Sequence, residues 1–231
     1  MSSTAIVTGA NSGIGYAFAK ILVKEGYEVH AIDMTVGEQM QKLGCKTYQC
    51  DLRSESSIQS FGEHFKDKRL DILLNIAGVM APPEEDALAT TTYSTLLKTF
   101  STNTFGPLLL TQALLPSLLI SPHPRIGFMS SRVGSISDNS SGGSYAYRAS
   151  KAALNSVGKS MAVDLKEKGI VVVLMHPGYV KTGILASERM EQVKEAVDPG
   201  EAAEKLWKVL MEKGMKDSGR FWHREGTELP W

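Results

Sequence analysis

Short, strongly apolar segments alternate along the chain with longer segments in which apolar residues recur every three or four positions. The short segments predict strands, because strands covered by helices on both faces are apolar at nearly every position. The longer segments predict helices that bury one face. The expected strands are residues 5–8, 28–32, 46–49, 72–75, 125–129, 171–175 and 220–223. The expected helices are residues 14–24, 55–66, 93–119, 147–168 and 199–211.

This repeated alternation predicts an α/β fold with a doubly wound, mostly parallel, seven-stranded sheet that is flanked by helices on both faces. A chain of 231 residues is long enough for one well-buried domain and short for two, so we expect a single domain over residues 1–231. The serine- and glycine-rich segment 135–144 is interpreted as a loop inside that domain, because a helix follows it at once.

A glycine-rich segment, TGANSGIG at residues 8–15, lies between the first strand and the first helix. Glycines at such a turn let the backbone approach a pyrophosphate, and free N–H groups at the start of the helix bind its negative charge. A glycine triplet alone is a weak signal, but its position after the first strand predicts a Rossmann fold that binds a dinucleotide. The residues expected to contact this cofactor are Gly9, Asn11, Ser12, Gly13, Ile14 and Gly15.

Two aspartates follow the next two strands. Asp33 closes the second strand, where a carboxylate accepts hydrogen bonds from the adenosine 2′-hydroxyl and repels a 2′-phosphate. The sequence therefore favours NAD(H), with NADP(H) as the alternative cofactor and a solvated strand-end residue as the alternative role for Asp33. Asp51 either contacts the adenine edge or caps the helix that begins near residue 55.

A tyrosine and a lysine four positions apart, Tyr147 and Lys151, share one face of the predicted helix 147–168. A fixed positive charge near a phenol favours the phenolate, so we expect the pKa of Tyr147 to fall below its ordinary value of about 10. A phenol of that kind can exchange protons with an alcohol or a carbonyl. Such pairs also arise by chance, so the interpretation depends on the neighbouring motifs. Tyr145 has Ala149 four residues later and lacks such a partner.

Composition excludes several classes of function. Lysine and arginine number 25 and aspartate and glutamate number 25, so no net charge attracts nucleic acid or an anionic membrane. Cys45 and Cys50 lack the further ligands of a zinc site, so we expect buried free thiols and no metal. No secretory leader precedes the first strand, which favours a cytoplasmic protein. Residues 99–124 carry no Asp, Glu, Lys or Arg, but polar residues and prolines favour a buried or interface helix over a membrane span.

Taken together, these residues resemble the short-chain dehydrogenase/reductase family over nearly the whole chain. Six motifs follow one another in the family's order: the glycine segment, Asn75-Ile76-Ala77-Gly78, Asn103, Ser130-Ser131, Tyr147 with Lys151, and Pro177-Gly178 followed by Val180 and Thr182. Ile76 departs mildly from the family's usual second asparagine. Segments 130–136, 142–148 and 176–178 are similar to the carbonyl-reductase-like branch that includes C-factor and sniffer proteins.

The resemblance implies an NAD(P)(H)-dependent oxidoreductase that interconverts a secondary alcohol and a ketone or aldehyde. Tyr147 would be the general acid in reduction and the base in oxidation, and Lys151 would lower its pKa and hold the nicotinamide ribose. Ser131, preferred to Ser130, would hydrogen-bond the substrate oxygen. Asn103 would bend its helix and anchor a water that links Lys151 to solvent. The further cofactor-binding residues that the resemblance implies are Asp51, Leu52, Asn75, Ala77, Gly78, Tyr147, Lys151, Pro177, Gly178, Val180 and Thr182.

Substrate identity is expected to depend on residues 79–89, 134–144 and 183–197, the last interpreted as an amphipathic lid. Arg132 and Arg148 either attract an anionic small-molecule substrate or are solvated surface residues. Two other functions stay open: an NADPH-dependent carbonyl or quinone reductase, and a dinucleotide-binding signalling or scaffold protein of C-factor type. The resemblance also implies a homodimer or homotetramer, and residues 228–231 are expected to dock onto their own domain or a neighbour.

Overall fold

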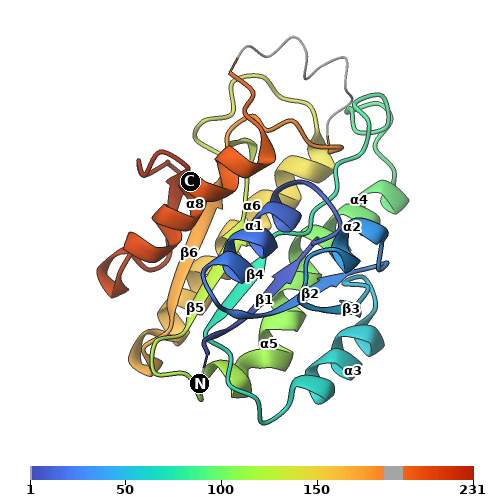
Figure 1. Ribbon diagram of the computed structural model, residues 1–231. Helices are drawn as coiled ribbons and strands as arrows, with labels where there is room; N and C mark the ends of the chain where they lie inside the picture. The colour runs from blue at the N-terminus through green and yellow to red at the C-terminus, as the bar shows by residue number, and fades with distance from the viewer. Residues whose placement is uncertain (1, 185–194) are drawn as a thin grey trace.

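The computed structural model describes residues 2–184 and 195–231, which form one seven-stranded sheet in which every strand pair is parallel (Figure 1). The strand order is β3-β2-β1-β4-β5-β6-β7, so the chain starts in the middle, runs to one edge and then crosses to the other. The bounds are β1 Thr4–Thr8, β2 Glu28–Asp33, β3 Lys46–Gln49, β4 Ile72–Asn75, β5 Arg125–Met129, β6 Val171–His176 and β7 Arg220–His223. The doubly wound fold predicted from the sequence is confirmed.

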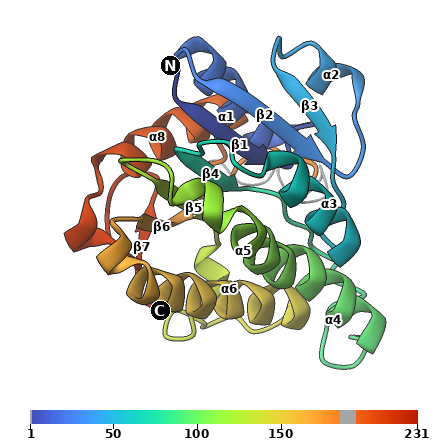
Figure 2. The same cartoon turned by 90° about the horizontal axis from the view of Figure 1, so that it is seen from below.

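Helices cover both faces of the sheet (Figure 2). One face carries α1 Gly13–Lys24, the short α2 Glu38–Gln41 and α8 Pro199–Glu212. The other carries α3 Glu55–Phe65, α4 Tyr93–Phe100, α5 Gly106–Leu118 and α6 Tyr145–Asp164. The four-residue α2 escaped the sequence analysis, since one helical turn is too short to show a period.

The protein has a hydrophobic core on each face of the sheet, and both cores follow from the alternation of side chains along each strand. Ile6 and Val172 belong to the core beneath α3, α5 and α6, whereas their neighbours Val7 and Val173 belong to the core beneath α1 and α8. Successive residues of a strand point to opposite faces, so a sheet buried on both sides needs an apolar residue at every position. This explains why central strands such as β4 and β6 are readable as continuous apolar runs, whereas the edge strands β3 and β7 carry polar residues.

The prediction of one continuous helix over residues 93–119 is wrong, because the helix is interrupted near its middle. A turn of π-helix, Ser101–Phe105, separates α4 from α5 and contains Asn103. Pro107 has no N–H, so it cannot donate the regular helical hydrogen bond to the carbonyl of Asn103. The backbone hydrogen-bond pattern of the helix is therefore interrupted one turn before the proline. Single π-turns of this kind frequently occur at functional sites.

The carboxyl ends of all strands meet at one edge of the sheet, shown at the top of Figure 1. The chain order reverses between β1 and β4, and open parallel sheets bind their ligands outside the carboxyl ends at such a switch point. The segments after β1, β4, β5 and β6 are those in which the sequence motifs lie. None of the helices in the described ranges is both long enough and apolar enough to span a bilayer.

Candidate active site

The glycine segment forms a tight turn between β1 and α1. A Cβ on Gly15 would lie 2.2 Å from the carbonyl oxygen of Gly9, so only glycine fits there. Ser12 occupies the N-cap of α1 without capping it, and the first helical turn holds no acidic residue. This arrangement fits the pyrophosphate of a dinucleotide, because backbone N–H groups and the positive end of the helix dipole face the same point.

The motif after β4 is tied to this turn by one hydroxyl. Thr8 Oγ1 accepts hydrogen bonds from the backbone N–H groups of Ile76 and Ala77, at 2.8 and 2.9 Å. Asn75, at the end of β4, is buried in the strand, and the contact brings two neighbouring strand ends together. The expected cofactor residues of both motifs therefore line one edge.

Asp33 lies at the rim of the same edge. Its carboxylate accepts hydrogen bonds from the N–H of Asn11 at 3.0 Å and from its neighbour Met34 at 2.7 Å. The side chain of Asn11 in turn binds the segment after β2, where Gly37 N–H donates to its Oδ1 at 2.8 Å. These hydrogen bonds fix the carboxyl group beside the glycine segment, and its role in the choice of cofactor stays a prediction.

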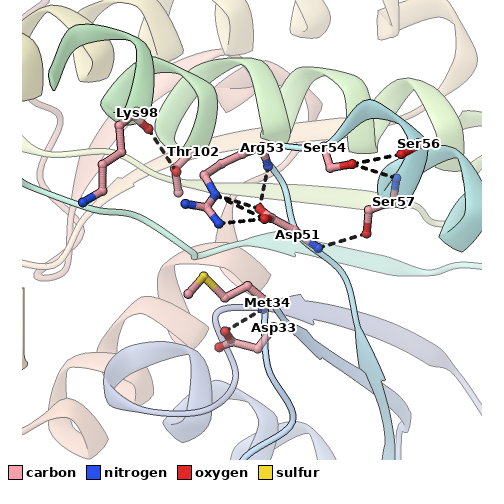
Figure 3. A network of polar contacts seen from close by, with 9 residues as sticks. All are labelled: Asp33, Met34, Asp51, Arg53, Ser54, Ser56, Ser57, Lys98 and Thr102. Carbon is pink, nitrogen blue, oxygen red and sulfur yellow. Dashed lines mark hydrogen bonds and ion pairs between the residues drawn. The ribbon is translucent and has the colours of Figure 1, made fainter. Parts of the chain in front are cut away.

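Figure 3 shows the end of β3 opposite Asp33 and Met34. Asp51 accepts a hydrogen bond from Arg53 Nη2 at 2.7 Å, and this partner lowers the pKa of its carboxyl group. The alternative that Asp51 caps α3 is wrong, because Ser54 holds that position and its Oγ accepts from Ser57 N–H at 3.3 Å. An open cleft of about 460 Å³ adjoins this point, and its lining residues are Asp51, Arg53, Ser54, Ser94, Leu97, Lys98 and Ser101. Its position suits the adenine end of a dinucleotide.

The proton-transfer candidates converge at the end of β5. Ser131 stands just after that strand, and its hydroxyl acts on the phenol of Tyr147 from α6 in the direction that lowers the phenol pKa. Lys151, one turn further along α6, donates from Nζ to the carbonyl of Met129 at 2.8 Å and lies 5.8 Å from the centre of the Tyr147 ring. Ser130 instead points away and donates to Asn155 Oδ1 at 2.5 Å. The geometry thus separates the two serines that the sequence left adjacent.

The expectation of a lowered phenol pKa is wrong for the protein alone. Burial raises the pKa of Tyr147, and the hydrogen bond from Ser131 opposes this only in part. Burial also lowers the pKa of Lys151 to about 8, since its side chain is almost entirely enclosed. Removal from water disfavours the charged form of both groups, and it is the largest cause of both pKa shifts.

Asn103 lies at the centre of this site, fully buried in the π-turn. Its Oδ1 accepts from the N–H of Val79 at 2.8 Å, and its Nδ2 donates to the Val79 carbonyl at 2.9 Å and to Ser150 Oγ at 3.0 Å. A Cβ on Gly78 would lie 3.4 Å from both Asn103 Oδ1 and Lys151 Nζ. The side chain therefore joins the segment after β4 to α6, and its part in a water chain stays a prediction.

The segment after β6 contacts the glycine segment. Thr182 lies against the glycine segment, because a Cβ on Gly13 would be 3.2 Å from its Cγ2. Val180 is buried and pairs with Val197 in an isolated β-bridge. Most of the lid predicted over residues 183–197 lies outside the described residues, since the structure leaves out 185–194.

Arg224 also supports this segment, and the sequence analysis missed it. Its side chain is 10% exposed, and the guanidinium donates from Nη1 to the carbonyl of Pro177 at 2.6 Å and to that of Tyr179 at 3.2 Å. Gly178 between them has φ +70°, and a Cβ there would lie 2.5 Å from Nη1. No motif marks an arginine 46 residues away from the loop it holds, so only the pairing of β6 with β7 reveals it.

Replacing Arg224 with Met should therefore raise KM for the nicotinamide cofactor about tenfold and change kcat less, because hydrogen bonds from a charged donor hold the loop. Steady-state kinetics with varied cofactor measures this split. Arg220→Met is the matched control, since Arg220 lies on the same strand and its pair with Glu228 is exposed. An unchanged cofactor KM in Arg224→Met would contradict the role.

The arginines near the substrate side have partners within the protein. Arg148 donates to the carbonyls of Val133 and Gly142, both at 3.2 Å, so it holds the segment 133–142 in place. Arg132 is exposed and pairs with Asp138. Neither contact favours the anionic-substrate interpretation. The last residues dock on their own domain, as one of the two expectations had it, because Trp231 stacks on Phe221 with ring centres 5.9 Å apart.

Comparison with known proteins now decides the family. The sequence profile described as short chain dehydrogenase matches residues 3–193. The chain belongs to the short-chain dehydrogenase/reductase family. As a member of this family it is an oxidoreductase with a Rossmann-type fold, and membership supports enzyme activity with NAD(P).

Relatives of this short-chain dehydrogenase include an enzyme and a signal protein. A 1-hydroxy-2-glutathionyl-2-methyl-3-butene dehydrogenase from Rhodococcus sp. (strain AD45) is 34% identical over 99% of this chain and 100% of its own length. The C-signal of Myxococcus xanthus is 38% identical over 70% of this chain and 93% of its own length.

Solved structures agree in fold and branch. The NADPH-bound carbonyl reductase from chicken fatty liver is 31% identical, has a TM-score of 0.87, and is matched over 100% of this chain and 99% of that chain. The carbonyl reductase Sniffer of D. melanogaster is 30% identical with a TM-score of 0.88, and the match covers 100% of both chains. The predicted similarity to C-factor and sniffer proteins is thereby confirmed.

Proposed function

We propose that this protein is an NAD(H)-dependent dehydrogenase/reductase that interconverts a secondary alcohol and its ketone or aldehyde. The observation that carries the proposal is the set of Ser131 with the buried Tyr147 and Lys151 at the carboxyl end of β5, beside a glycine turn that fits a pyrophosphate. Proton donors and a dinucleotide site at one sheet edge are what such a reaction requires.

The chain's own residues supply the proton and hold the oxygen. When bound, the nicotinamide ring supplies or accepts the hydride. Tyr147 keeps its proton through neutral pH, because burial raises its pKa, so it suits the general acid in carbonyl reduction. Ser131 shares the same oxygen and stabilises the charge that develops there. Lys151 and the segment 177–182 would hold the nicotinamide ribose and carboxamide.

The cofactor preference rests on Asp33. Its carboxylate lies against the glycine segment, so it would accept hydrogen bonds from a ribose 2′-hydroxyl and repel a 2′-phosphate. We expect NADH to bind at least tenfold more tightly than NADPH, and Asp33→Ala to weaken NADH and strengthen NADPH binding. Titration of cofactor fluorescence with wild type and variant measures both dissociation constants.

Glu38→Ala is the matched control for this titration, since Glu38 is an exposed acidic residue on the same side of the sheet at the start of α2. It should leave the ratio of the two constants unchanged. Tighter binding of NADPH by the wild type would instead support the alternative of an NADPH-dependent carbonyl reductase. The similarity to the NADPH-bound carbonyl reductase from chicken fatty liver is the argument for that alternative.

The substrate is to be found with a panel of ketones, aldehydes, quinones and secondary alcohols, glutathionyl alcohols included because of the Rhodococcus relative. We expect cofactor-dependent turnover of apolar carbonyls. Cofactor binding without turnover of any compound would favour the signalling or scaffold alternative, for which the similarity to C-signal is the argument.

We also propose a homodimer or homotetramer in the cytoplasm. Apolar side chains exposed on α4 and its continuation support the assembly, namely Tyr93, Phe105 and Leu108. Both cysteines are free thiols, which suits a reducing compartment.

A further inference from the structure

The catalytic helix α6 begins without a cap of its own. Ser144 stands at its N-cap, but its backbone is left-handed, with φ 48° and ψ 50°, and its side chain makes no capping hydrogen bond. The first turn of the helix holds no acidic residue either. A capping side chain normally needs an extended backbone to reach the N–H groups of the first turn, so Ser144 cannot serve them.

A carboxylate 60 residues earlier in the chain takes this position. Asp86 Oδ1 accepts from the N–H of Ala146 at 2.7 Å, and Oδ2 accepts from the N–H of Tyr147 at 3.1 Å. Thr91 Oγ1 donates to the same Oδ1 at 3.2 Å, and the residue is 1% exposed. Both oxygens are therefore used, and one of them binds the backbone of the tyrosine that carries the phenol.

The backbone of Tyr147 is held at both ends. Its carbonyl accepts from Ser150 Oγ at 2.8 Å, and that hydroxyl accepts from Asn103 Nδ2 at 3.0 Å. Asn103 also holds Val79, so the segment between β4 and α4 is attached to the start of α6 at two points, Val79 and Asp86. This segment was expected from the sequence to help determine the substrate, and the contact couples it to the phenol.

From this geometry we propose that Asp86 is a positioning residue for Tyr147, whose carboxylate sets the place of the phenol relative to Ser131 and the bound substrate. The proposal rests on the function proposed above. Asp86 acts through the helix backbone and does not touch the reacting atoms. A displacement of a catalytic group by about 1 Å can lower the rate about 100-fold, so a support of this kind is visible in kcat.

Asp86→Asn is the informative variant, because an amide keeps the volume but offers one acceptor in place of two and turns its NH₂ group toward an N–H donor. We expect kcat for carbonyl reduction to fall about 10- to 100-fold, with KM for NADH unchanged within about twofold. In a Tyr147→Phe background the same substitution should lower the residual rate less than about threefold, since its effect passes through the phenol.

Asp71→Asn is the matched control. Asp71 is also a buried aspartate, 5% exposed, and accepts from the N–H of Thr4 at 2.8 Å, but it lies at the amino ends of the strands. It should lower stability as Asp86→Asn does and leave kcat unchanged. If Asp86→Asn fails to fold, Thr91→Val removes the hydroxyl that donates to Asp86 Oδ1 at 3.2 Å and to the Ala87 carbonyl at 2.7 Å, and a several-fold loss of kcat is expected.

A readout without turnover separates this proposal from the proposed function. In NMR spectra with ¹³Cζ-labelled tyrosine, the Tyr147 signal, assigned by its absence in Tyr147→Phe, should shift in Asp86→Asn and not in Asp71→Asn. A wild type that turns over no carbonyl or alcohol overturns the proposed function, and the NMR comparison still decides the contact. An unmoved signal, full kcat in Asp86→Asn, or an equal loss in the Tyr147→Phe background overturns the role of Asp86.

Discussion

Replacing Tyr147 with Phe is expected to lower turnover by about 10²- to 10⁴-fold, while the dissociation constant of NADH changes less than about twofold. The substitution removes one oxygen from a buried ring, so it deletes the proton donor and leaves the backbone contacts of α6 in place. Single-turnover oxidation of NADH with the best carbonyl substrate measures the rate, and fluorescence titration measures the cofactor affinity.

Tyr145→Phe is the control for this experiment, because Tyr145 undergoes the same chemical change two residues earlier on an exposed part of the helix. It should keep full activity. Because burial raises the pKa of Tyr147, the wild type should also oxidise alcohols faster as the pH rises, since oxidation needs the phenolate. Full turnover in Tyr147→Phe would remove the basis for the catalytic assignment.

Lys151→Met is expected to lower kcat/KM for reduction about 100- to 1,000-fold, because it removes a fixed ammonium from a water-poor site. The pKa of Lys151 is lowered to about 8, so the side chain is charged below that pH and loses its proton above it. In the wild type, kcat/KM for reduction should therefore fall as the pH rises through about 8, and in the variant this limb should be missing. A pH profile from about 6 to 10 measures both.

The free energy of unfolding should rise with pH over the range in which kcat/KM for reduction falls. Between pH 8 and 10.5 the unfolded chain binds more protons at Lys151 than the folded protein does, so the charge on the buried lysine costs the folded state about 3 kcal/mol below pH 8. Lys151→Met removes that cost and also the donor to the Met129 carbonyl, so we expect a melting temperature at pH 7 no lower than that of the wild type. Lys159 is exposed in the same helix, so Lys159→Met should change neither kcat/KM for reduction nor the melting temperature. A variant that melts well below the wild type, or that keeps the alkaline limb, would argue against this role of Lys151.

The central strands were predictable because burial on both faces requires an apolar residue at nearly every position, as in residues 171–175. The glycine segment was predictable for a local reason as well, since the turn between Gly9 and Gly15 admits no side chain. The break at Ser101–Phe105 was less so. Pro107 predicted an irregularity in the helix, but a proline does not determine whether the helix kinks, ends or adopts a π-turn.

The sequence by itself determined the parallel fold, and it predicted a dinucleotide site at residues 8–15 and a proton-transfer role for Tyr147 with Lys151, because these patterns lie within one strand, one turn or one helical face. Only the tertiary structure decided that Ser130 donates to Asn155, that burial raises the pKa of Tyr147, that Asp86 accepts from the first turn of α6 and that Arg224 donates to the loop after β6. Those properties depend on desolvation and on contacts between residues far apart in the chain. Neither leaves a periodic or local trace in the sequence, since any acidic or basic residue in a loop can make such a contact once the fold brings it there.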